Sequence, residues 1–121
     1  MRVYIKLYIS LMIKVYLIEA ELNDNKLYKI GFTRRNIEER IKELKTGNAS
    51  NFTIINQYES KWGTKIEAYL HRLYDQKKIN GEWFNLTNDD VKDFYSICEK
   101  IDNNFNVIEE LNSYYQEKGK F

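Results

Sequence analysis

Apolar and aromatic residues are interspersed with polar ones in two runs near the start of the chain, as is typical of β-strands. These runs cover residues 13–21 and 26–32, and Asn23, Asp24 and Asn25 lie between them as turn residues. Two such runs around a short polar turn predict an antiparallel hairpin. A third strand is expected over residues 52–58, which are rich in β-branched and aromatic side chains.

Helical spacing of apolar residues follows these strands. Over residues 37–45 the apolar residues recur three or four positions apart, and Asn36 stands where a helix cap is expected. A second helix is predicted over residues 62–77, with Ile66, Leu70 and Leu73 as its buried stripe.

The last third of the chain predicts one short apolar segment and two helices. Residues 82–86 follow an Asn-Gly turn and are expected to pack onto the sheet. Apolar residues at helical spacing predict a helix over residues 91–101, residues 102–104 (Asp-Asn-Asn) are expected to break it, and a last helix is predicted over 107–116. The fold class is α+β, with a small antiparallel sheet and helices packed against it.

The length and the N-terminal composition bound the organisation of the chain. Its 121 residues suit one domain, which we place at residues 13–101, after an N-terminal extension (1–12) and before a helical tail (102–121). The start is rich in Ile, Leu, Val and Tyr, but Lys6 and Lys14 interrupt it and no cleavage site follows, so neither a signal peptide nor a membrane span is expected. Met1 and Met12 both remain as candidate natural starts.

Charge and cysteine content add two expectations. The formal net charge is only +1, yet residues 26–47 hold seven basic residues against three acidic ones, whereas residues 88–110 hold seven acidic residues against two basic ones. This asymmetry predicts a basic working face and an acidic back, or simply two solvated faces. A single cysteine, Cys98, cannot form an internal disulfide, so we expect a reducing cytoplasm.

A phosphate-binding site is predicted where the strand over residues 27–32, with Gly31 near its end, leads into the next helix. A glycine lets the backbone turn or approach a ligand closely. Arg40 falls in the second turn of the following helix, at the border between its apolar stripe and solvent. An arginine so placed can hold two phosphate oxygens through its planar guanidinium group.

Four motifs in this order resemble the GIY-YIG nuclease superfamily, within it a phage and bacterial branch. They are Leu-Tyr-Lys-Ile-Gly (27–31), Glu-Glu-Arg-Ile-Lys-Glu-Leu (38–44), the Glu67–His71 pair, and Gly-Glu-Trp-Phe (81–84), preceded by Val15-Tyr16. The resemblance implies a central three-stranded antiparallel sheet flanked by helices. It also implies metal-dependent cleavage of DNA by a bacterial or phage enzyme.

Carried over residue by residue, the resemblance implies a catalytic set of Tyr16, Lys29, Arg40 and Glu67, with Glu67 holding one Mg²⁺ or Mn²⁺ ion. Tyr28, His71 and Glu82 would support this set, and four basic residues would contact DNA: Arg34, Arg35, Lys42 and Lys45. Two positions depart from the family pattern. Lys14 stands in place of the first glycine and Lys29 in place of the second tyrosine, which shifts Tyr28 by one position and to the opposite sheet face.

Each residue alone also has an ordinary structural explanation, and three functions remain open. Tyr16 and Tyr28 suit strand packing, Arg40 a surface ion pair, and Glu67 with His71 an exposed helical pair. The first hypothesis is an endonuclease; the second is a DNA-binding or regulatory module that has weak catalysis or none. The third is a protein-interaction domain that uses its C-terminal helix or apolar N-terminus. A domain this small is expected to need a homodimer or a partner protein for targeting. Association with a membrane is not expected.

Overall fold

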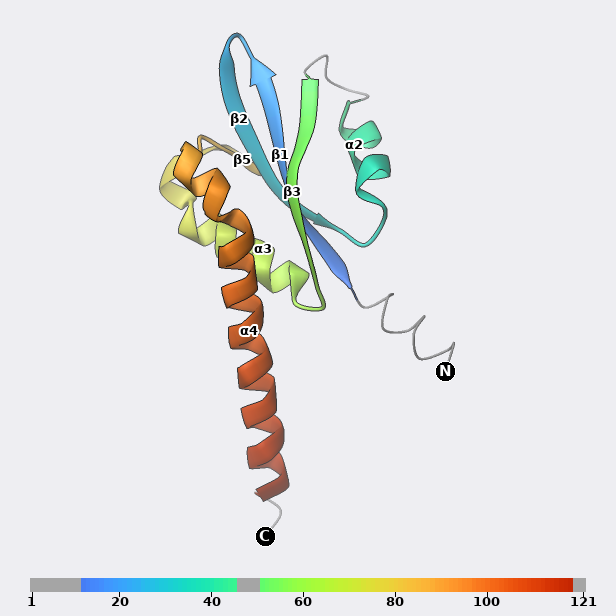
Figure 1. Cartoon of the computed structure of the whole chain (residues 1–121), viewed down its shortest axis with the longest axis vertical. Helices are drawn as coiled ribbons and strands as arrows, with labels where there is room; N and C mark the ends of the chain where they lie inside the picture. Colours follow the sequence, from blue (N-terminus) through green and yellow to red (C-terminus); the bar gives the residue numbers. More distant parts are fainter. Residues whose placement is uncertain (1–11, 46–50, 119–121) are drawn as a thin grey trace.

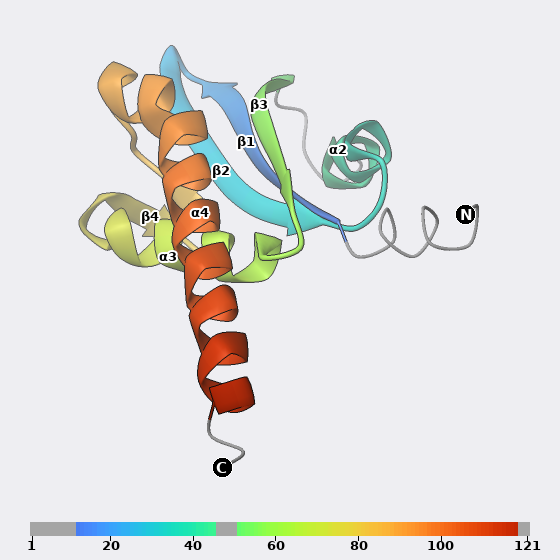
Figure 2. The same cartoon turned by 60° about the horizontal axis from the view of Figure 1, so that its bottom comes forward.

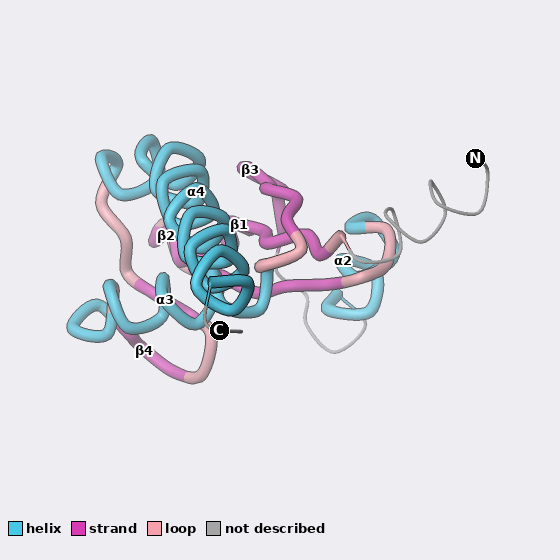
Figure 3. Tube along the Cα trace, turned by 90° about the horizontal axis from the view of Figure 1, so that it is seen from below, coloured by secondary structure: helices cyan, strands magenta, loops and turns pink. Residues whose placement is uncertain are grey.

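The computed structural model describes residues 12–45 and 51–118. Figure 1 shows an antiparallel sheet with helix α2 (Ile37–Lys45) on one side and helices α3 (Gly63–Leu73) and α4 (Asn88–Lys118) on the other. Figure 3 shows the same three layers from below. The predicted extension up to residue 11, the residues that follow the first predicted helix (46–50) and the last three residues lie outside the described residues.

The predicted hairpin is confirmed. Strands β1 (Ile13–Leu22) and β2 (Asn25–Thr33) pair antiparallel, from Lys14 opposite Thr33 to Leu22 opposite Asn25. Asn23 and Asp24 connect them with positive φ angles of 51° and 66°. Both residues tolerate this left-handed conformation, and a two-residue turn of this kind matches the twist of the paired strands.

The prediction of a three-stranded sheet is wrong, because the sheet has five strands in the order β3-β1-β2-β5-β4. Strand β3 (Asn51–Ser60) pairs with β1, as expected for the third strand. The additional strands β4 (Lys78–Asn80) and β5 (Trp83–Phe84) form a small hairpin around Gly81, whose φ is +55°. Strand β5 lies within the segment 82–86, which is expected from the sequence to pack onto the sheet. Strand β4 has three residues, too few to show an alternating pattern, and the sequence does not predict it.

Helix α3 is shorter than predicted, and its buried side differs. It ends at Leu73 and is followed by a 3₁₀ turn (Asp75–Lys77). Ile66 and Leu70 are buried as predicted, but Leu73 is 49% exposed and Tyr74 is buried in its place. The chain leaves the helical path at this point, so spacing no longer decides which residue faces the core.

The predicted break at residues 102–104 is also wrong, since α4 runs unbroken through it (Figure 2). Asp102 accepts hydrogen bonds from the Tyr58 and Ser60 hydroxyls of β3, and Asn106 accepts one from the Trp62 indole at 2.8 Å. Polar side chains that bond to neighbouring elements leave the helical backbone intact, although the same residues favour turns in isolation. No helix in the described part of the chain is long and apolar enough to cross a membrane.

Alternating residues of β1 divide the core into two. Val15 and Leu17 pack with α3 and α4, whereas Tyr16 and Ile18 pack with α2 on the other face. Asn36 caps α2 by accepting a hydrogen bond from the Glu38 amide at 2.8 Å. Arg40 borders the buried stripe of α2, and its side chain lies beside Tyr16.

Candidate functional site

Tyr16 is fully buried and lies across the backbone of β2. It pairs with Gly31 in the hairpin, and a Cβ atom added to Gly31 would lie 2.3 Å from the Tyr16 hydroxyl oxygen and 2.5 Å from Cζ. These distances are far shorter than any ordinary van der Waals contact. Only glycine at position 31 allows the ring to occupy this place, so the expected close approach at Gly31 is made by Tyr16.

The Tyr16 hydroxyl is buried and has no hydrogen-bond partner of proper geometry among the described residues. Burial raises the pKa of Tyr16, and the neighbouring Glu82 and Glu67 carboxylates raise it further, while the Arg40 guanidinium beside it lowers it. The hydroxyl therefore keeps its proton and can donate a hydrogen bond. A buried polar group without a partner costs about 1–3 kcal/mol and calls for a functional explanation.

Arg40 lies at the border between core and solvent, as predicted from the helical spacing. Its side chain is 34% exposed, and Nη1 lies 3.2 Å from Oε2 of Glu43 on the next turn of α2. The two terminal nitrogens of Arg35 also lie 2.7 and 2.8 Å from the carboxylate oxygens of Glu43. The two arginines lower the pKa of the Glu43 carboxyl through these hydrogen bonds. Glu43 therefore holds both guanidinium groups on the exposed side of the site.

Glu67 and His71 reach the site from α3. The His71 Nε2 atom lies 3.0 Å from Oε1 of Glu67 and 2.8 Å from the carbonyl oxygen of Ile30. A carbonyl oxygen can only accept, so Nε2 carries a proton and cannot ligate a metal. His71 instead fixes the position of Glu67, whose side chain is 14% exposed. Burial raises the pKa of Glu67 and Glu82 raises it further, whereas His71 and Lys29 lower it.

Lys29 lies on the same sheet face as Tyr16 and is almost buried. Its Nζ lies 2.6 Å from Oε2 of Glu82 and 5.5 Å from the centre of the Trp83 ring. Tyr28, as predicted, points to the opposite face, where its hydroxyl donates to Glu19 at 3.1 Å. Tyr28 is therefore separated from the site and belongs to the core beneath α3 and α4.

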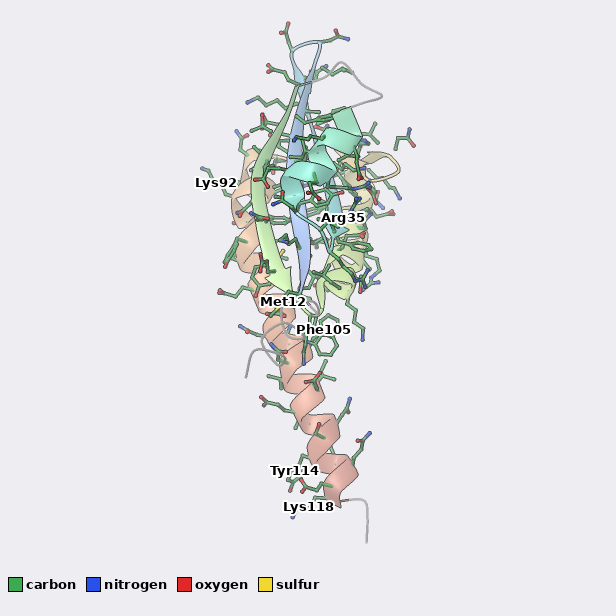
Figure 4. The ribbon with its side chains drawn as sticks, turned by 90° about the vertical axis from the view of Figure 1, so that its right-hand side faces the viewer. Met12, Arg35, Lys92, Phe105, Tyr114 and Lys118 are labelled. Carbon is green, nitrogen blue, oxygen red and sulfur yellow. The ribbon has the colours of Figure 1, made fainter. Side chains whose placement is uncertain are left out.

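The basic residues expected to contact DNA surround α2. Arg34, Arg35 and Lys42 are exposed, and Arg35 lies at the start of the helix (Figure 4). The side chain of Lys45 lies outside the described residues. Lys14, which departs from the motif pattern, donates to the carbonyl oxygen of Arg35 at 3.3 Å and so ties this loop to β1.

Electrostatic interactions connect Tyr16 with Arg40, Glu82 and Glu67, and they connect Glu67 with His71 and Lys29. Tyr28 lies apart from these residues, on the other sheet face. The sequence did not identify Glu43 or Lys14 as parts of the site; Glu43 was visible only as one neighbour of Arg40 on a helix. In the described part of the chain no group of three His, Cys, Asp or Glu side chains could hold a metal ion. A metal here would depend on Glu67, on water and on substrate oxygens, which suits Mg²⁺ or Mn²⁺.

Comparison with known proteins corrects the resemblance drawn from the motifs. The family model that matches is that of the T5orf172 domain, over residues 13–99, and no GIY-YIG model matches. The short motifs therefore do not assign the chain to the GIY-YIG superfamily. No curated protein and no solved structure matches the chain.

Proposed function

We propose that this chain, which belongs to the T5orf172 domain family, is a metal-dependent endonuclease that hydrolyses phosphodiester bonds in DNA. One observation carries the proposal. The buried Tyr16 hydroxyl has no hydrogen bond of proper geometry, the Arg40 guanidinium lies beside it, and the Glu82 and Glu67 carboxylates are near enough to raise its pKa. A phosphate oxygen would pair with the guanidinium. An attacking water would accept a hydrogen bond from the Tyr16 hydroxyl and donate one to a carboxylate.

The carboxylate of Glu67 would hold the divalent ion. It is a hard oxygen donor, and Mg²⁺ needs only one or two protein carboxylates because it keeps several waters and binds substrate oxygens. Such an ion supplies positive charge to the phosphate and lowers the pKa of a bound water. His71 donates its Nε2 proton to the Ile30 carbonyl oxygen of β2, and with Nε2 also 3.0 Å from Oε1 of Glu67 it would keep the carboxylate facing the site.

Arg40 would bind the non-bridging oxygens of the scissile phosphate. Removing one such donor from a preorganised site costs about 10²–10³ in rate. Tyr16 would orient the attacking water, because its raised pKa opposes a role as the base. Lys29 is held by Glu82, so it would act as a fixed positive charge and position Glu82.

DNA would approach along the basic residues of α2 and the preceding loop. Phosphate contacts by Arg34, Arg35, Lys42 and Lys45 would make the affinity fall steeply with salt. The chain would work in the cytoplasm of a bacterial or phage-infected cell, where its single cysteine stays reduced. Targeting by a homodimer or a partner protein is part of this proposal, since the basic surface is small.

A DNA-binding module without catalysis is the second candidate. The observation that favours it is the 2.6 Å ion pair between Lys29 and Glu82, which neutralises a lysine at the centre of the site. In that case DNA binding would be sensitive to salt, and no divalent metal would produce cleavage.

The test is a plasmid-nicking assay with Mg²⁺ or Mn²⁺ on wild type, Arg40→Lys and Arg72→Lys. Arg72 is exposed on α3 and serves as the matched control. We expect nicking by wild type and by Arg72→Lys, and a loss of about 10²–10³ in rate for Arg40→Lys, because lysine cannot hold two oxygens at once. Salt-dependent binding by the wild type without nicking would support the second candidate instead.

A further inference from the structure

A cleft of about 250 Å³ lies on the same sheet face as the site, between the β4–β5 hairpin and the ends of β1 and β2. Apolar side chains line it: Ala20, Leu22, Leu27, Phe52, Ile79 and Trp83. We call this feature the tip cleft. Leu22 and Ile79 are 48% and 53% exposed, so the apolar surface is open to a ligand.

The lining of the tip cleft suits a flat aromatic ligand. Phe52 and Trp83 lie with ring centres 5.7 Å apart and their planes inclined by 32°, so they already form an aromatic wall. Among the described residues of the lining Asn80 is the one polar side chain, and an asparagine amide can both donate and accept hydrogen bonds at a base edge. Stacking on aromatic side chains is the common way in which proteins hold unpaired bases of any sequence.

The tip cleft adjoins the candidate site at Trp83. Trp83 pairs with Lys29, and the lysine ammonium lies over its ring. Ala20 is four residues from Tyr16 on β1, a separation of about 13 Å at the rise of a β-strand. A nucleic-acid strand with its phosphate at Arg40 can therefore place a base a few nucleotides away in the cleft.

We propose that the tip cleft binds one unstacked nucleobase of the DNA strand whose phosphate occupies the candidate site. This inference rests on the proposed function and deepens it, because it makes single-stranded or locally opened DNA the preferred substrate. A duplex cannot offer a base face to Trp83 unless one base leaves the stack.

Binding is tested without metal, so that cleavage plays no part. The probe is a fluorescently labelled single-stranded oligonucleotide in EDTA, and its affinity is measured by anisotropy. We expect Trp83→Leu to weaken binding about 5- to 150-fold, the range that loss of one stacked base produces. The matched control is Trp62→Leu, which removes the other tryptophan, on the α3–α4 side, and should leave the affinity unchanged.

Two further measurements keep the test decisive. If Trp83→Leu does not fold, Ile79→Ser replaces it, with Leu73→Ser as a control of similar exposure on the opposite face. Oligonucleotides with one abasic site at successive positions should show weakened wild-type binding at one position only, and Trp83→Leu should abolish that dependence.

The possible results separate the two proposals. A position-dependent abasic effect in a protein that never cleaves DNA would refute the nuclease and leave the tip cleft standing. Metal-dependent cleavage with a uniform abasic profile would refute the tip cleft alone. Equal affinities of Trp83→Leu and Trp62→Leu, or no DNA binding at low salt, would also overturn the base-binding role.

Discussion

Gly31→Ala should destabilise the domain through its contact with Tyr16 and through nothing else. Gly31 lies in β2 without a positive φ, so alanine is free of backbone strain there. The new methyl group would lie 2.3–2.9 Å from three atoms at the far end of the Tyr16 ring, which is fully buried. Overpacking of this kind costs about 1–3 kcal/mol of unfolding free energy.

A double-mutant cycle isolates this contact. Tyr16→Leu removes the three clashing ring atoms and keeps an apolar side chain in the core. In that background Gly31→Ala should become stabilising by about 0.4–1 kcal/mol, because alanine restricts the unfolded chain more than glycine does. The change of sign is the signature of a steric conflict between these two residues.

Urea denaturation of the four proteins measures the cycle, with unchanged m-values as the check on two-state behaviour. If Gly31→Ala costs the same in both backgrounds, the ring does not lie over Gly31 and the site geometry is wrong. Gly31→Ala should also lose nuclease activity, since the displaced Tyr16 hydroxyl can no longer orient a water.

Three further predictions concern stability. Tyr16→Phe removes a buried hydroxyl that has no hydrogen bond of proper geometry, so it should raise the free energy of unfolding by about 1–3 kcal/mol and lower activity; a loss of stability would show that the contact with Arg40 is a stabilising hydrogen bond. The folded-state pKa of Glu67 is raised, so its ionised form destabilises the fold above the unfolded-state pKa. Glu67→Gln should therefore be more stable than wild type at neutral pH, and urea titrations should show this gain vanishing in acid. Asp102→Ala should lose about 1.5–3 kcal/mol for each of its bonds to Tyr58 and Ser60, measured by denaturation beside Tyr58→Phe, which removes one bond only.

The sequence predicts well those elements whose pattern is long and local. The β1–β2 hairpin follows from its strand composition and from the Asn-Asp turn, and α2 follows from Ile37, Ile41 and the Asn36 cap. It fails where tertiary contacts decide. The polar residues at 102–104 favour a turn by themselves, but Asp102 is bonded to β3 and the helix continues.

In the candidate site, too, the sequence predicts the features that local spacing determines and misses those that tertiary contacts determine. Helical spacing places Arg40 at the edge of the core, and strand alternation separates Tyr28 from Lys29. Spacing places Glu43 one turn from Arg40, but it cannot show that Glu43 also holds Arg35, because that contact depends on how the loop before α2 folds back. Nor could four short motifs decide the family, since each motif fits a common local structure, whereas the family model compares residues 13–99 as a whole.

The most direct test of the proposed nuclease is Glu67→Gln beside Glu59→Gln, an exposed control on β3. DNA binding and DNA cleavage are measured on the same preparations, with Mg²⁺ or Mn²⁺ and enzyme in excess. We predict that Glu67→Gln binds DNA like the wild type but does not cut it, while Glu59→Gln does both. Cleavage by Glu67→Gln at the wild-type rate, or a wild type that cuts no DNA, would contradict the proposal.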